Sequence, residues 1–299
     1  MILCDAHADT LFRMAEKHEG PYDLSLERLK KGGVSLQVLA LFVGMDNKPQ
    51  MVKAHVGRML QAMDSLIQTG WVKTDDPQTA KAGETRFMLS VEGSEVFGTD
   101  IAGITAFREL GVRMAAVTWN HENLLATPAV INQTDGLKPL GLKMVREMQR
   151  LKIAVDVSHL NIPGFYDILN RTDAPPLASH SCCHALCGHP RNLKDDQLKE
   201  LFRQGGYVGV NFYPSFLTDW DEPCTIDTVI DHIDHMHQMG GEGKVGFGSD
   251  FDGISSKPEG LNDPSDFPRL LDGLRKRGYT KESIRAIAGE SFLNYYKRI

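Results

Sequence analysis

The sequence predicts a single (β/α)8 barrel of the TIM type, and three observations lead to this fold. Eight short apolar runs alternate with longer amphipathic stretches along the 299 residues. One α/β barrel often needs a chain of about this length. Polar groups that commonly bind metals follow five of the eight runs. We therefore expect residues 1–299 to form one barrel domain with a metal site at the carboxyl ends of its strands.

The eight apolar runs have the length and composition of strands. In a barrel of this kind, the chemistry lies where the strands end. The runs that we expect to form the barrel are residues 2–6, 36–42, 87–91, 114–118, 154–157, 177–179, 208–211 and 245–248.

The stretches between the runs carry helical patterns and helix start signals. The clearest pattern places Val56, Met59 and Met63 at a spacing close to 3.6 residues. Asn192 and Asp195 are typical of residues that precede a helix. The stretches that we expect to be helical are residues 52–68, 142–151, 196–204, 225–239 and 268–277.

The bulk composition excludes several classes of partner. The net charge of −6 argues against nucleic acid and anionic membrane surfaces, which select basic patches. The longest apolar run, residues 34–43, has half of the ~20 residues that a membrane-spanning helix needs. An acid at Asp5 interrupts any signal-peptide core. Five cysteines without a scaffold pattern indicate reduced thiols, so we expect a cytoplasmic protein.

Metal-type ligands follow four of the strand-like runs. His7 and Asp9 are two residues apart in an extended segment, so both side chains project to one side. Glu92, His159 and His180 end three further runs. One divalent ion has room for only some of these five groups, whereas two ions that share a carboxylate and a hydroxide use them all. Imidazole and carboxylate without thiolate suit zinc, with manganese, iron or cobalt as substitutes.

The order and spacing of several short motifs closely resemble those of the renal (membrane) dipeptidase family, which are zinc peptidases on an amidohydrolase-type barrel. The resemblance extends from residue 5 to about residue 253. Its motifs are Asp5-Ala6-His7-Ala8-Asp9-Thr10, Val91-Glu92-Gly93, Asp156-Val157-Ser158-His159, Ser179-His180-Ser181, Arg191-Asn192 and Gly246-Phe247-Gly248-Ser249-Asp250-Phe251-Asp252-Gly253.

The resemblance implies a dipeptidase with two zinc ions and a role for each matching residue. His7 and Asp9 would bind the first ion, His159 and His180 the second, and Glu92 would bridge both. A hydroxide between the metals would attack the peptide bond.

The resemblance also implies how the substrate is held. Arg191 would grip the free carboxylate of a small dipeptide, because a guanidinium fits a carboxylate bidentately. The neighbouring Asn192 is grouped with it as a substrate contact. Asp250 would carry the proton from the attacking water to the leaving amine. Barrels of this sort often form dimers, so the sequence is compatible with a homodimer.

The segment after the fourth strand departs from the family pattern. Many members have a Thr-His pair there, and that His touches the substrate near the scissile bond. This chain reads Thr118-Trp119-Asn120-His121, with Trp119 where the His is expected. His121 lies two residues further on, and we take it as a candidate substitute for the substrate contact.

Other functions remain compatible with the sequence. A related barrel hydrolase would act on N-acyl amino acids, lactones or cyclic amides, and Arg191 does not separate these from dipeptides. A metal-binding protein without turnover is opposed by Asp250, since a structural centre needs no proton carrier.

Two further clusters of His and Cys are expected not to bind metal. Residues 182–189 contain three cysteines and two histidines, but they lack the paired spacing of a structural zinc site. His232, His235 and His237 fall within one helical stretch, where spacings of three and five residues do not place them all on one face. We expect ordinary hydrogen-bonded or exposed histidines there.

Overall fold

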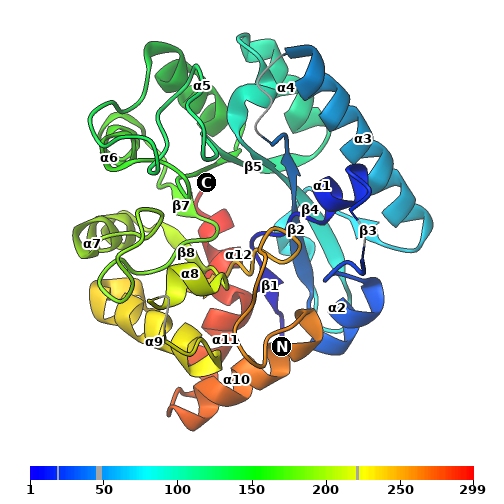
Figure 1. Cartoon of the computed structure of the whole chain (residues 1–299), viewed down its shortest axis with the longest axis vertical. Helices are drawn as coiled ribbons and strands as arrows, with labels where there is room; N and C mark the ends of the chain where they lie inside the picture. The colour runs from blue at the N-terminus through cyan, green and yellow to red at the C-terminus, as the bar shows by residue number, and fades with distance from the viewer. Residues whose placement is uncertain (19, 45–48, 220–221) are drawn as a thin grey trace.

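Eight parallel strands close into a barrel in the computed structural model, which describes residues 1–18, 20–44, 49–219 and 222–299 (Figure 1). Pairing of β2 with β4 and of β9 with β1 completes the ring. The barrel strands are β1 (Cys4–Asp5), β2 (Leu36–Phe42), β4 (Arg86–Glu92), β5 (Val112–Ala116), β6 (Ala154–Asp156), β7 (Leu177–Ala178), β8 (Tyr207–Val210) and β9 (Val245–Phe247).

Helices surround the barrel, as Figure 1 shows. The longer ones are α3 (Pro49–Gln68), α4 (Ile101–Glu109), α5 (Pro139–Arg150), α6 (Ile162–Arg171), α7 (Asp195–Arg203), α9 (Ile226–Met236) and α10 (Phe267–Lys276). The shorter ones are α1 (Thr10–Ala15), α2 (Leu26–Gly32), α8 (Pro214–Leu217), α11 (Lys281–Arg285) and α12 (Ser291–Tyr296). Short turns of helix are η1 (Pro77–Thr79), η2 (Ser94–Phe97), η3 (His237–Gly241), η4 (Pro264–Asp266) and η5 (Ala286–Glu290). Within the described ranges, no helix has the length and apolar character needed to cross a membrane.

The eight predicted strands are confirmed, with ends that differ from the expected ones by at most two residues. The five predicted helices correspond to α3, α5, α7, α9 and α10. One further strand, β3 (Val72–Lys73), pairs beside the start of β4 without joining the ring. Most of the helices that the sequence did not predict, such as α1 and α2, span less than three turns. So short a segment repeats too few apolar positions for its period to be recognised.

The barrel has an inner and an outer apolar layer. On β4, Phe87, Leu89 and Val91 pack in the large cluster beneath the helices, whereas Met88 packs in a second cluster with residues of α12. Alternation along a strand therefore places Glu92, the last residue of β4, on the same inner face as Met88.

Helix α12 closes the amino-terminal end of the barrel. Figure 1 shows it within the ring of strands. Its tyrosines bond to backbone near the strand starts: Tyr295 donates to the Pro175 carbonyl at 2.9 Å and Tyr296 to the Arg113 carbonyl at 3.3 Å. The opposite end of the barrel, where the strands terminate, is left for the polar residues described below.

Close packing of the strand ends requires glycine at position 248. A Cβ on Gly248 would lie 1.8 Å from the Ser179 carbonyl oxygen, and this neighbour is backbone that moves only with β7. We expect Gly248→Ala to lower the free energy of unfolding by about 3 kcal/mol, measured by urea denaturation. Gly188→Ala is the matched control, because a Cβ there meets nothing within 4 Å. Equal stability of the two variants would show that the strand ends yield to a methyl group.

Candidate metal centre

The barrel brings together the five residues that the sequence proposed as metal ligands, together with Asp250. Each lies at or just beyond the carboxyl end of a strand: His7 after β1, Glu92 at the end of β4, and His159, His180 and Asp250 after β6, β7 and β9. Five of these six residues are at most 6% exposed, and the Asp250 side chain is 14% exposed. Residues far apart in the sequence thus meet because parallel strands end at the same side of the barrel.

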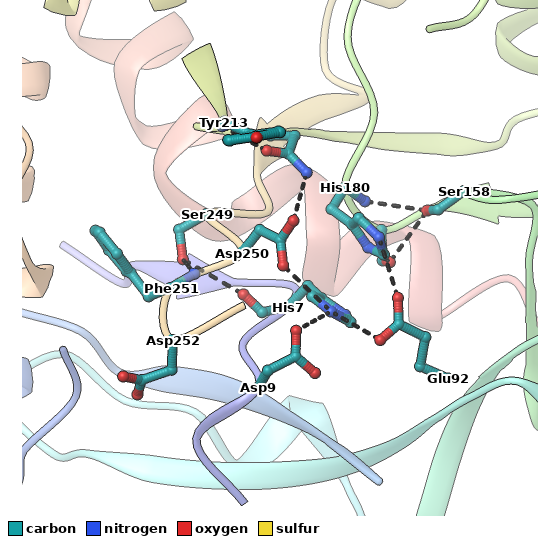
Figure 2. A network of polar contacts seen from close by, with 12 residues as sticks. His7, Asp9, Glu92, Ser158, His180, Tyr213, Ser249, Asp250, Phe251 and Asp252 are labelled. Atoms are coloured by element: carbon teal, nitrogen blue, oxygen red, sulfur yellow. Dashed lines mark hydrogen bonds and ion pairs between the residues drawn. The ribbon is translucent and has the colours of Figure 1, made fainter. Parts of the chain in front are cut away.

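Three carboxylates surround the Nε2 atom of His7 (Figure 2). This nitrogen lies 3.4 Å from Asp9 Oδ2, 3.7 Å from Glu92 Oε2 and 3.7 Å from Asp250 Oδ1. In one donor group, ligand atoms of His7, Asp9 and Asp250 all lie within 4.8 Å of one another. His7, Glu92 and His180 form a second such group.

The second carboxylate oxygen of Glu92 faces the other two histidines. Glu92 Oε1 lies 2.7 Å from His159 Nε2 and 3.5 Å from His180 Nε2, and the two imidazole nitrogens are 3.0 Å apart. Glu92 therefore presents one oxygen to His7 and the other to His159 and His180. A carboxylate in this position is suited to bridge two adjacent cations.

Hydrogen bonds behind His180 fix the orientation of its ring. Its Nδ1 lies 2.7 Å from Ser179 Oγ, and this hydroxyl in turn donates to Asp156. Asp156 also accepts from the Ser158 hydroxyl at 2.6 Å. With its Nδ1 hydrogen directed at Ser179, His180 keeps the Nε2 lone pair free for a ligand, which is the arrangement typical of metal-binding histidines.

The donor set fits divalent cations. His7 Nε2 and Asp9 Oδ1 are buried without a hydrogen-bond partner among the described residues, which is costly unless another group satisfies them. Burial alone favours neutral His7, but the Glu92 and Asp9 carboxylates raise the pKa of His7 to about 10. Burial and the Asp9 carboxylate raise the pKa of Glu92. The cluster therefore attracts positive charge strongly.

Asp250 is held at the edge of this cluster by its backbone and one asparagine. Its N–H donates to the His7 carbonyl at 3.1 Å, and its φ of 63° is a conformation that Asp tolerates better than most residues. Asn211 Nδ2 donates to Asp250 Oδ2 at 2.8 Å, which leaves Oδ1 facing His7. Burial raises the pKa of Asp250 to about 7, so this carboxylate takes up a proton readily near neutral pH.

Arg191 supplies an unpaired buried cation beside the cluster. It is 3% exposed, and all three of its guanidinium nitrogens lack a hydrogen-bond partner in the described part of the chain. Its guanidinium carbon lies 5.5 Å from the centre of the Phe216 ring. Burial lowers the pKa of Arg191 to about 10, which leaves it charged at neutral pH. A buried guanidinium with no protein partner is suited to bind an incoming carboxylate.

Asn192, predicted as a substrate contact, instead braces the segment that carries Arg191. Its Nδ2 donates to the carbonyls of Cys187 and Phe216, both at 2.8 Å. The side chain is 4% exposed and does not belong to the cavity lining. Asn192 therefore supports the backbone around Arg191 and does not face the cavity.

A cavity of about 700 Å³ connects the metal-type donors with Arg191. Its described lining includes Asp9, Glu92, His159, Arg191 and Asp250. An aromatic wall closes one side, where the rings of Phe12, Phe42 and Trp119 follow one another at 4.8 Å spacings. A dipeptide is small enough to reach both ends of a space of this volume.

The segment after β5 directs different residues to this cavity than the sequence suggested. Trp119 and Asn120 belong to the lining, and His121 does not. His121 Nε2 lies 2.8 Å from Glu95 Oε1 instead. Glu95 lines a separate, mostly apolar cavity of about 840 Å³ that adjoins α3 and η2. His121 is thus not brought to the site, and Asn120 lines the cavity together with Trp119.

Most of the residues in the two other His and Cys clusters make local contacts, whereas His237 Nε2 is buried without a hydrogen-bond partner among the described residues. The thiols of Cys182, Cys183 and Cys187 donate to the carbonyls of different segments and do not converge. The buried His232 accepts from the Cys183 N–H and contacts the Leu217 carbonyl at 2.8 Å. His235 pairs with Asp195 at 2.7 Å. His232 and His235 therefore meet the expectation of hydrogen-bonded histidines, and His237 does not.

Two asparagines of the site were not recognised from the sequence. Asn120 contacts His159, and Asn211 holds Asp250. Both follow the ends of barrel strands, β5 and β8. This position in the sequence could have marked them as candidates for the site. An amide side chain is common in turns, which makes such a signal weak without coordinates.

Comparison with known proteins agrees with this geometry. A family model for membrane dipeptidases (peptidase family M19) matches residues 1–299. An uncharacterized dipeptidase of Schizosaccharomyces pombe is 32% identical over 99% of this chain and 80% of its own length.

Solved structures give the same result. A metallo peptidase from Rhodobacter sphaeroides, liganded with a phosphinate mimic of the dipeptide L-Ala-D-Ala, is 26% identical with a TM-score of 0.91, over 100% of this chain and 99% of that chain. A second metallo peptidase, dipeptidase AC, is 28% identical with a TM-score of 0.91, over 100% of this chain and 98% of that chain. The chain belongs to the membrane dipeptidase family, peptidase family M19, and is a metal-dependent dipeptidase.

Proposed function

We propose that this chain hydrolyses dipeptides with a free carboxyl terminus at a centre of two divalent cations, with zinc as the native metal. The observation that carries the proposal is the pairing, in one cavity, of a crowded donor cluster with the unpaired Arg191 guanidinium. The cluster supplies nitrogen and oxygen donors without thiolate, which suit zinc. Arg191 supplies the complement to a substrate carboxylate.

Five residues would hold the two ions. His7 and Asp9 would bind one ion, His159 and His180 the other, and Glu92 would bridge them with its two oxygens. When bound, such cations polarise a carbonyl group and lower the pKa of water towards neutrality. The hydrogen bonds behind His180 keep its ring in the tautomer that this binding needs.

The protein's own residues position the dipeptide and move the proton. Arg191 binds the terminal carboxylate and so fixes the distance from the chain end to the scissile bond. Asp250 accepts the proton of the attacking water on Oδ1, and Asn211 holds its other oxygen. Asp250 then donates this proton to the leaving amine. The aromatic wall of Phe12, Phe42 and Trp119 excludes water from one side of the cavity.

An assay panel tests the substrate class. We expect the metal-loaded protein to hydrolyse free dipeptides and to leave dipeptide amides intact, because an amide offers Arg191 no carboxylate. The panel includes L,L, L,D and D,D dipeptides, since a 26% identical relative was solved with a mimic of L-Ala-D-Ala. N-acyl amino acids and lactones complete the set. Faster turnover of either of these than of every dipeptide would contradict the proposed substrate class.

The metal count gives an independent test. We expect two ions per chain in the zinc-loaded protein and a loss towards one in His159→Ala, because this change removes a nitrogen 2.7 Å from the Glu92 carboxylate. Elemental analysis after gel filtration measures the ratio. The control is His235→Ala, which removes a histidine that pairs with Asp195 outside the cavity. An unchanged count in His159→Ala would remove His159 from the ligand set.

A further inference from the structure

Asn120 lies directly behind one of the candidate metal ligands. It follows β5, lines the active-site cavity and is partly buried. Its side-chain Oδ1 lies 2.9 Å from His159 Nδ1. On the other side of the same imidazole, His159 Nε2 faces Glu92 Oε1 at 2.7 Å and His180 Nε2 at 3.0 Å.

This geometry assigns a tautomer to His159. The Nε2 atom points at the other donors of the cluster, so its lone pair must stay free if the residue is to bind a cation. The ring proton then resides on Nδ1 and is donated to Asn120 Oδ1. Asn120 therefore does for His159 what Ser179 does for His180.

The same orientation leaves the amide nitrogen of Asn120 with two hydrogens to donate. Among the described residues, none accepts a hydrogen bond from Asn120 Nδ2, although Asn120 lines the cavity. The two residues on either side of Asn120 in the sequence make other contacts. His121 is paired with Glu95, and Trp119 packs against Phe42 at 4.8 Å.

We propose that Asn120 has two functions, which rest on the proposed dipeptidase reaction. Through Oδ1 it is a positioning residue that fixes the ring of His159. Through Nδ2 it donates a hydrogen bond to the carbonyl oxygen of the scissile peptide bond. That oxygen gains negative charge as the bond is attacked, and a donor already held in place stabilises the charge without reorganisation. Asn120 thereby fills the substrate-contact role that the structure denies to His121.

Two substitutions separate these functions. Asn120→Asp keeps an acceptor for His159 Nδ1 but removes the donor. Asn120→Leu has a similar shape and removes both. We expect Asn120→Leu to weaken binding of the second metal ion by about 10- to 100-fold, measured by competition with a chelating dye, and Asn120→Asp to retain wild-type affinity. A purely structural role would instead lower the melting temperature of both variants and leave metal affinity unchanged.

At saturating zinc, both variants should lose about 100-fold in kcat for a dipeptide, because both lack the donor. In Asn120→Asp, the new carboxylate also repels the negative charge on the carbonyl oxygen, which would lower kcat by itself. The uncharged Asn120→Leu variant therefore tests the donor function of Nδ2. Both should also bind a phosphinate dipeptide mimic more weakly by a similar factor. Asn262→Leu is the control, since Asn262 is exposed and its side chain donates to Asp266.

Three results would overturn the assignment or distinguish its parts. Wild-type kcat in Asn120→Leu at saturating zinc removes the donor function. Wild-type metal affinity in Asn120→Leu removes the positioning function. A wild-type protein that hydrolyses no dipeptide overturns the proposed function instead, and the metal titrations still decide whether Asn120 positions His159.

Discussion

Asp250→Asn should abolish most turnover while the metal content per chain stays at the wild-type value. Asp250 reaches the donor cluster with Oδ1, 3.7 Å from His7 Nε2, and Asn211 holds its other oxygen. An amide has nearly the same shape but takes up no proton at neutral pH. Since positioned acid–base groups contribute about 10²- to 10⁴-fold, we expect kcat to fall by about 1,000-fold. Steady-state kinetics and elemental analysis on the same preparation measure both quantities.

A matched substitution on the outside of the barrel provides the control. Asp196 lies in the first turn of α7 and accepts a hydrogen bond from the Tyr166 hydroxyl at 2.8 Å. Asp196→Asn makes the same chemical change without approaching the cavity, so kcat should stay at the wild-type value. Near-normal turnover of Asp250→Asn would assign proton transfer to another group. Loss of metal from this variant would instead make Asp250 a ligand.

The convergence of the site residues could be anticipated because it follows from topology. Once eight strands alternate with helices, the strands run parallel and their carboxyl ends meet at one side. Residues as distant as His7 and His180 are then expected close together, and their rings lie 3.9 Å apart. Neither the register of the strands nor the exact loop path is needed for this step.

The direction of side chains in the loops could not be anticipated. His121 and Asn120 are adjacent in the sequence, yet one pairs with Glu95 and the other lines the cavity. The choice depends on the backbone dihedrals of a segment with no repeating structure, and neither helix nor strand periodicity applies there. Asn192 illustrates the same limit, because a neighbour of Arg191 turned towards backbone carbonyls rather than the substrate.

The sequence also did not reveal where side chains lie close to the backbone of a distant segment. A Cβ at Gly253 would lie 2.2 Å from Asp9 Oδ2 and 2.5 Å from Asp250 Oδ1. In the sequence this glycine is only the last residue of one of the short motifs. In the structure it makes room for two carboxylates of the donor cluster, and such a requirement becomes visible only when distant strands are assembled.

Arg191→Met should raise KM strongly and make the protein more stable. Methionine preserves much of the side-chain volume but offers no hydrogen bond to a carboxylate. The loss of a charge-assisted, bidentate contact corresponds to about 3 kcal/mol, or about 100-fold in kcat/KM. The folded protein also carries the cost of a buried guanidinium whose three nitrogens lack partners among the described residues. Removing that charge should raise the melting temperature.

The two effects together distinguish a substrate-binding arginine from a structural one. If Arg191 held the fold together through contacts of its own, its removal would lower the melting temperature along with the activity. Arg191→Lys refines the comparison, because a lysine keeps the charge but loses the planar fork, and it should recover only part of the lost kcat/KM. The Arg191→Met variant should also hydrolyse free dipeptides and their amides at similar rates. Neither terminal group then has a guanidinium to bind. An unchanged KM for dipeptides would mean that another group holds the substrate carboxylate, and the unpaired guanidinium would need a different explanation.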